Sequence, residues 1–138
     1  MTGETDLDRL IATMGPELRP GVFVFAHLPP GAATAGLSPV MHFAEAEGTT
    51  LILTREVAEA TGIDAIYPCR MITLKIHSSL EAIGFLARIT TALADAGISV
   101  NPVSAFYHDH LFVPENRARE AMEILVGMAR AMGPVERR

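Results

Sequence analysis

The sequence predicts an α+β protein made of two small halves whose antiparallel sheets are shared or paired. The clearest observation is the order of elements in residues 70–113, where a strand is followed by a helix and two further strands. A second observation is that residues 22–61 repeat part of this order, as a strand, a hairpin and a helix. The composition agrees, since 49% hydrophobic and 20% charged residues in a chain of 138 are typical of a compact fold. We therefore divide the chain into an incomplete N-terminal half with a leading helix, residues 1–66, and a C-terminal half, residues 67–138.

Each element of the N-terminal half is marked by the residues that begin or end it. Thr5 and Asp8 have the spacing of a capping box, with Asp in place of the usual Glu, so they predict a helix start. Gly48 can adopt the positive φ of a tight hairpin turn, and Gly62 is a typical residue for a helix end. The predicted elements are a helix over residues 5–14, a strand over 22–28, a loop over 29–39, a hairpin over 40–54, a helix over 55–61 and a connector over 63–69.

The C-terminal half begins with an alternating pattern, in which Ile72, Leu74 and Ile76 share one face of a predicted strand. Ser78 and Glu81 then have capping-box spacing, so we expect the following helix to begin at Ser78. The predicted elements are a strand over residues 70–77, a helix from Ser78 to Ala96 closed by Gly97, a strand over 98–106 that is weakened or bulged at Asn101-Pro102, a returning strand within 107–113 and a helix over 115–132 stopped at Gly133-Pro134.

The overall composition argues against several classes of partner. The net charge is −5, and the eleven Lys and Arg residues, of which Lys75 is the one lysine, form no basic stripe, so nucleic acid is not expected as a partner. The single cysteine, Cys69, excludes a disulfide within the chain and favours a reducing compartment. No apolar run approaches the ~20 residues that span a bilayer, and the acidic N-terminus does not resemble a signal peptide. We therefore expect a cytoplasmic protein with no membrane partner.

The loop in front of the predicted helix is the main candidate ligand site. Backbone N–H groups at a helix start attract anions, so Ser78 and Ser79, with the neighbouring Leu80, are candidates to hold the carboxylate of a small ligand. The alternative is that Ser78 only caps the helix and Ser79 is solvated. Asn101 precedes Pro102 and is therefore extended. Its amide can donate and accept, which suits either an amino-acid ligand or the stabilisation of a bulge.

The segment His108-Asp109-His110 and the residue Glu47 are further polar candidates. On a regular strand His108 and His110 share a face and could ligate a transition metal such as Zn²⁺, although no third ligand has a convincing spacing. Local turn chemistry and direct ligand contact are the alternatives. Glu47 lies at the predicted hairpin, where it is either solvated or pairs with a ligand amino group. No phosphate loop, dinucleotide fingerprint or nucleophile elbow is present, so we expect no cofactor, no bound metal and no catalytic residue.

Several of these motifs together resemble a bacterial family of ACT-domain proteins, from about Leu7 to Val126. The motifs that carry the resemblance are His77-Ser78-Ser79-Leu80-Glu81-Ala82, Gly84, Gly97-Ile98-Ser99 with Asn101, His108-Asp109-His110 with Phe112-Val113, and, in the first half, Glu45, Glu47-Gly48-Thr49 and Thr50. The resemblance implies two ACT-like units of the ferredoxin-like βαββαβ kind. In many ACT domains the loop between the first strand and the first helix carries an acidic residue and a glycine. Here Gly84 is the first glycine after the strand, and we expect it one turn inside the helix.

The resemblance also implies a role, because ACT domains generally bind amino acids or other small effectors between paired domains and regulate enzymes or transport. We therefore expect a non-catalytic regulatory or sensor module that binds a small effector, an amino acid first, between its two halves, and forms a homodimer. Any regulated enzyme would be a separate chain. Two alternatives stay open: a metal-dependent enzyme that uses His108 and His110, and a pure dimerisation or interaction module formed through exposed sheet edges.

Overall fold

The computed structural model describes residues 6–132, and these residues form two compact units. Residues 20–69 form the first unit, which we call the insert unit because the other unit contains the chain on both sides of it. Residues 6–19 and 70–132 belong to the second, which we call the terminal unit. Strand β5, Ala65–Leu74, passes from the insert unit into the terminal unit, so each unit uses one part of it.

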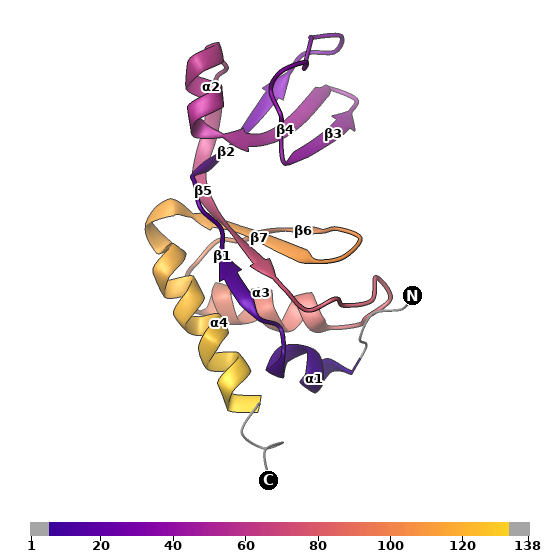
Figure 1. The fold of residues 1–138 in the computed structure, drawn as a ribbon, viewed down its shortest axis with the longest axis vertical. Coiled ribbons are helices and arrows are strands. Elements are labelled where there is room, and N and C mark those ends of the chain that lie inside the picture. The colour runs from indigo at the N-terminus through magenta and orange to yellow at the C-terminus, as the bar shows by residue number, and fades with distance from the viewer. Residues whose placement is uncertain (1–5, 133–138) are drawn as a thin grey trace. The chain divides into compact units, whose positions relative to one another are not determined.

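The terminal unit is a sheet with helices packed on one face (Figure 1). Its elements are α1 (Leu7–Ala12), β1 (Pro16–Leu18), the second part of β5, α3 (Phe85–Asp95), β6 (Asn101–Ser104), β7 (Asp109–Pro114), the 3₁₀ turn η1 (Glu115–Arg117) and α4 (Ala118–Met132). Strand β1 pairs with β5, and β7 lies between β5 and β6. The order β1-β5-β7-β6 makes β6 an edge strand of this unit.

Alternation along β7 decides which of its side chains reach the helices. Leu111 and Val113 are buried in the core between the sheet and the helices, and Asp109 begins the same alternate row. The neighbouring His110 therefore points to the opposite face of the sheet. The buried core of this unit consists of Leu10, Ile11, Met14, Ile72, Leu74, Phe85, Ile89, Leu93, Ile98, Leu111, Val113, Ala118, Ala121 and Leu125.

The insert unit is a four-stranded antiparallel sheet of order β3-β4-β2-β5, with one helix on one of its faces. Its elements are β2 (Phe23–Leu28), β3 (Met41–Glu45), β4 (Gly48–Thr54), α2 (Arg55–Thr61) and the first part of β5. The core under the helix consists of Val24, Ala26, Leu37, Leu51, Leu53 and Ala58. Because strand side chains alternate, Phe25, His27 and Thr50 lie on the face away from α2.

Three glycines adopt the conformations that the sequence predicts. Gly62 ends α2 with φ +72°, and Gly97 follows α3 with φ +75°. Gly48 begins β4 with φ +141°, and a Cβ atom there would collide with the carbonyl oxygen of Leu28. The hairpin turn therefore requires glycine for its backbone conformation and for its space.

The predicted α+β class is confirmed, and most elements lie close to their predicted bounds. The sequence analysis misses β1, because Gly15-Pro16 fits a helix stop, whereas proline is also tolerated as the first residue of a strand. The predicted connector over residues 63–69 is wrong, since β5 already begins at Ala65. Helix α1 is capped by Asp6, whose side chain accepts from the backbone N–H of Arg9 at 3.1 Å. The predicted cap Thr5 and the predicted stop Gly133-Pro134 lie outside the described residues.

The predicted bulge at Asn101-Pro102 is also wrong. Strand β6 pairs with β7 in an unbroken register, from Asn101 opposite Phe112 to Ser104 opposite Asp109. Proline is accommodated because the outer side of an edge strand pairs with no neighbouring strand, so an N–H group that points outward is not needed for a hydrogen bond. A register shift lies instead in the pairing of β2 with β5, between the pair Phe23–Cys69 and the pair Phe25–Ile66.

Candidate ligand pocket

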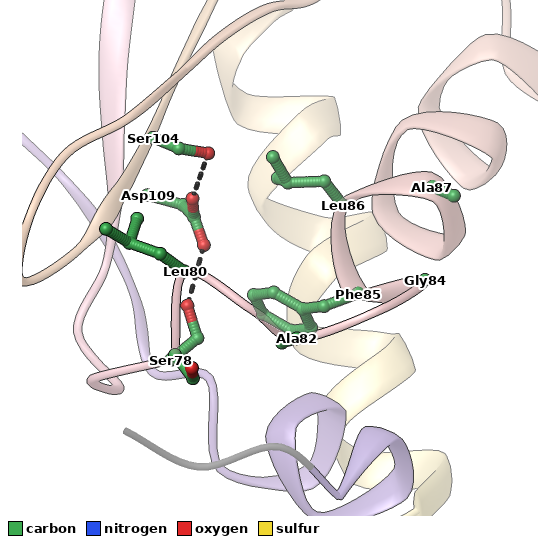
Figure 2. A pocket seen from close by; sticks show the side chains of 10 residues that line it. Ser78, Leu80, Ala82, Gly84, Phe85, Leu86, Ala87, Ser104 and Asp109 are labelled. Carbon is green, nitrogen blue, oxygen red and sulfur yellow. Dashed lines mark hydrogen bonds between the residues drawn. The ribbon is translucent and has the colours of Figure 1, made fainter. Parts of the chain in front are cut away.

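A pocket of about 140 Å³ opens in the terminal unit at the N-terminus of α3 (Figure 2). It is bounded by the loop of residues 77–84, by the first turn of α3 and by the hairpin of β6 and β7. The lining residues are Ser78, Ser79, Leu80, Ala82, Gly84, Phe85, Leu86, Ala87, Ser104 and Asp109. All of them belong to one compact unit, so the pocket is complete within it.

Helix α3 begins at Phe85, and the prediction that Ser78 caps it is therefore wrong. Ser78 lies in the loop and donates its hydroxyl hydrogen to Oδ2 of Asp109 at 3.0 Å. Ser79 makes the local turn instead, since its Oγ accepts from the N–H of Glu81 at 3.0 Å. The capping-box pattern fails here because Asp109, a partner distant in the sequence, takes the hydroxyl group that the helix start would have used.

Gly84 occupies the N-cap of α3 with φ +88°, and not a position inside the helix as expected. The helix can begin only after this left-handed residue, because an α-helix is right-handed throughout. The loop between β5 and α3 thus contains both Glu81 and Gly84. This corrected position agrees with the acidic residue and the glycine that the family resemblance implies for that loop.

The first turn of α3 borders the pocket with backbone N–H groups for which the described residues 6–132 supply no side-chain cap. No side chain caps the helix at Gly84, and the first helical hydrogen bond runs from the N–H of Arg88 to the carbonyl of Gly84 at 3.0 Å. The preceding N–H groups, of Phe85, Leu86 and Ala87, have no acceptor within the helix. Because all three residues line the pocket, the positive end of the helix dipole borders it.

Asp109 supplies the opposite charge on the other side of the pocket. Asp109 is only 6% exposed, and its carboxylate accepts hydrogen bonds from the hydroxyl of Ser78 at 3.0 Å and from the hydroxyl of Ser104 at 2.6 Å. Figure 2 shows both hydroxyls pointing at the carboxylate. Each carboxylate oxygen has a second lone pair, so Asp109 can accept further donors from a ligand.

The remaining lining is largely apolar. Leu80, Ala82, Phe85 and Leu86 border the space between the helix start and the carboxylate, and Phe85 is buried. The pocket therefore combines a site for negative charge, a site for positive charge and an apolar wall. A small zwitterion with an apolar side chain matches this combination.

The structure brings three of the predicted ligand-binding residues to the pocket. Ser78, Ser79 and Leu80 line the pocket. Asn101 is exposed at the start of β6, opposite Phe112, and does not line it. Glu47 lies in the hairpin turn of the insert unit, where its carbonyl oxygen accepts a 2.8 Å hydrogen bond from Nε2 of His27.

His108 and His110 lie side by side, with ring centroids 6.4 Å apart, on the sheet face opposite Asp109. Nδ1 of His110 is 3.0 Å from the hydroxyl oxygen of the buried Thr73. Burial lowers the pKa of His110, the positive charge that His108 can carry adds to this effect, and the carboxylate of Asp109 opposes it. In the part of the chain that the structure describes, no three His, Cys, Asp or Glu side chains are grouped to hold a metal ion.

Sequence reasoning missed Ser104 and the acidic partner Asp109 as pocket residues. One signal was available: Asp109 alternates with Leu111 and Val113, two apolar residues that predict the core-facing side of a strand. Ser104 could not be found in this way. Its position depends on the register of β6 against β7, which pairs it with Asp109.

The fold and the pocket define a small ligand-binding module, and the comparisons with known proteins identify its family. A sequence model of the ACT domain matches residues 2–70, and a second ACT-domain model matches residues 66–126. The chain belongs to the ACT-domain family, with two ferredoxin-like ACT units in tandem. It is a ligand-binding regulatory module of the class that these domains form. Because the two matches overlap at residues 66–70, the domain boundary after residue 66 stays a prediction.

Several solved structures share this fold. A Vibrio cholerae protein of unknown function, described as a possible transport protein, is 38% identical with a TM-score of 0.80, over 89% of this chain and 95% of that chain. An Agrobacterium tumefaciens protein is 16% identical with a TM-score of 0.72, over 83% and 88% of the two chains. The regulatory subunit of aspartate kinase from Thermus thermophilus is 12% identical with a TM-score of 0.61, over 85% and 97%.

Two further comparisons gave negative results. No curated protein sequence matches the chain. Among the described residues, 6–132, no helix combines the length and the apolar character that crossing a membrane requires.

Proposed function

We propose that this protein is a non-catalytic regulatory module whose effector is a small α-amino acid bound in the pocket at the start of α3. One observation carries the proposal: the uncapped N-terminus of α3 and the buried carboxylate of Asp109 border the same pocket. The ligand carboxylate binds the free N–H groups of the first helical turn, and the ligand ammonium binds Asp109.

The size of the pocket restricts the effector further. Its volume of about 140 Å³ is well below the ~300–1,000 Å³ of pockets that hold drug-sized ligands. The ligand side chain packs against Leu80 and Phe85, so a short apolar side chain is favoured over a long or charged one. Of the residues proposed from the sequence, we retain Ser78, Ser79 and Leu80 in this site.

The proposed setting is a cytoplasmic homodimer that regulates a separate enzyme chain. The edge strands β3 and β6 support the dimer, because unpaired strand edges favour pairing with another chain. Binding of the effector then changes the affinity of the module for its partner by the free energy that couples the two sites.

A thermal-shift screen of the twenty amino acids tests the proposal directly. A ligand that prefers the folded state stabilises it, by about 2.7 kcal/mol when its concentration is a hundred times Kd. We expect one or a few small apolar amino acids to raise the melting temperature. The matching amine without a carboxylate, and the matching acid without an amine, should have much smaller effects.

A pair of variants assigns the binding to the pocket. Asp109→Asn removes the charge with little change of shape, and it should abolish most of the thermal shift. Asp95→Asn removes the same charge from an exposed residue near the end of α3 and should leave the shift unchanged. Absence of any shift for folded protein across the whole panel would contradict the proposed function.

A further inference from the structure

A second candidate binding surface lies in the insert unit, on the sheet face away from α2. A groove of about 550 Å³ crosses β4, β2 and the start of β5. The residues that line it are Phe25, Ala26, His27, Thr50, Asp64, Ala65 and Ile66. None of these is a lysine or an arginine, His27 is the one ionisable base among them, and the family resemblance includes none of them except Thr50.

The polar side chains of this groove are all available as acceptors. Asp64 is exposed, and no other described residue pairs with its carboxylate. Nε2 of His27 donates to the carbonyl oxygen of Glu47 at 2.8 Å, and this partner assigns the hydrogen to Nε2 because a carbonyl only accepts. In the neutral ring Nδ1 is then an acceptor. The hydroxyl of Thr50 donates to the carboxylate of Glu45, which leaves the oxygen lone pairs of Thr50 free.

Phe25, which lines the groove, is in contact with Tyr67, a residue with an unusual backbone conformation. Tyr67 has φ +62°, which is rare for a bulky side chain, and it lies at the register shift between β2 and β5. Its ring meets that of Phe25 edge to face, with centroids 5.6 Å apart and an interplanar angle of 81°. Strain of this kind is often found at functional sites. Ile66, next to Tyr67, is 73% exposed and adds apolar surface.

We propose that this groove binds a small organic cation, an ammonium or guanidinium group carried on an apolar body. The carboxylates of Asp64 and Glu45 lie on the two sides of the row formed by His27 and Thr50, so the local charge is negative. The acceptors receive the N–H groups of the cation. The ring of Phe25 and the side chain of Ile66 contact its apolar body, and an aromatic face also attracts the cation itself.

Three probes of similar shape and different charge test this proposal. Phenethylammonium, 2-phenylethanol and 3-phenylpropionate are titrated separately into the ¹⁵N-labelled full chain at low salt, and the backbone amide signals are followed by NMR. We expect phenethylammonium alone to give saturable shifts centred on the groove residues, and these shifts should weaken as salt is added. Equal shifts from all three probes, or no shift from phenethylammonium, would overturn the proposal.

Two variants assign the binding to the groove and keep the fold intact. Asp64→Asn should weaken phenethylammonium binding by roughly two- to fivefold, as expected for an exposed ion pair, whereas Asp95→Asn should not. Tyr67→Gly removes the ring and tolerates the positive φ, so it should also weaken binding by roughly two- to fivefold without unfolding the unit. Unchanged binding by both variants would exclude this groove as the cation site.

Discussion

Ser104 and Asp109 face each other across β6 and β7, and the hydroxyl of Ser104 donates a 2.6 Å hydrogen bond to Oδ1 of Asp109. Together with Ser78 it satisfies a carboxylate that lies almost out of contact with solvent. A buried charge that loses one of its two donors is poorly compensated. This small network therefore holds the pocket wall and contributes to the stability of the hairpin.

Replacing Ser104 should destabilise the fold through this network. Ser104→Ala removes one of two donors to a buried carboxylate, and we expect a loss of about 1–3 kcal/mol in the free energy of unfolding. Urea denaturation of the natural chain and of the variant measures this loss in the free energy of unfolding. Ser79→Ala, which removes only an exposed loop hydrogen bond, should change the same quantity by less than about 0.5 kcal/mol. Similar effects of the two substitutions would show that the hydrogen bond from Ser104 to Asp109 contributes no more to the free energy of unfolding than an exposed loop hydrogen bond does.

The packing of α3 can be tested separately from the pocket. Leu93 is fully buried in the core of the terminal unit, so Leu93→Ala should cost about 2–5 kcal/mol, as the loss of buried methyl groups leaves a cavity. Ile83 lies in the loop before the helix and is 87% exposed. Ile83→Ala should therefore be close to neutral in the same chemical denaturation experiment. A small loss for Leu93→Ala would contradict the assignment of that helix face to the core.

The stability of the protein should fall on mild acidification because of His110. Its pKa in the folded state lies below the ordinary value of 6.5, chiefly through burial. As the pH falls through 6.5, the unfolded chain therefore binds a proton before the folded chain does, and this stabilises the unfolded state relative to the folded state. The contribution of His110 to the free energy of unfolding is complete above pH 6.5, and it is lost as the pH falls towards the lower pKa of His110 in the folded state.

A comparison of the natural chain with a variant at position 110 separates the effect of His110 on stability from that of the other four histidines. Denaturation midpoints of the natural chain and of His110→Gln are measured between pH 7.5 and 5. The variant cannot titrate at position 110, so its midpoint should depend less on pH. Parallel pH profiles for the two proteins would mean that His110 titrates equally in both states.

A glycine inside α4 offers a stabilising substitution. Gly127 lies in the middle of the helix, and apart from its chain neighbours and the nearby helix backbone no described atom lies within 4 Å of the position that a Cβ would take. Gly127→Ala should therefore stabilise the protein by about 0.5–1 kcal/mol, through helix propensity. Gly84→Ala should have the opposite sign, because φ at that residue is +88°. Differential scanning calorimetry of both variants checks the pair of signs.

The sequence predicted best those elements whose signals are local. Helix α2 lies between the cap Thr54, which accepts from Val57, and the left-handed Gly62, and its bounds were found correctly. The hairpin of β3 and β4 was found because Gly48 marks its turn. Such features depend on residues within a few positions of one another, so a single chain is enough to predict them.

The pocket was harder to predict because its contacts are not local. The spacing of Ser78 and Glu81 is a valid helix-start pattern, but the Ser78 hydroxyl bonds to Asp109, which is 31 positions away. Likewise, Pro68 suggests a connector, yet β5 continues through it, beside the register shift that follows Ile66. Both outcomes are decided by which strands lie next to each other, and one sequence does not reveal that.

The pairing of Phe23 with Cys69 has a kinetic consequence. Once residues 20–69 have folded, the two chain segments that flank them start close to each other. The N–H of Arg19, on one segment, donates to the carbonyl of Met71, on the other, at 2.8 Å. Folding of residues 20–69 has then already brought together the two ends of the long loop between β1 and the second part of β5. Pairing of these two strands therefore costs no further loop-closure entropy for that segment. We therefore expect the nested segment to assemble early, and a slip in its register to delay the rest of the molecule.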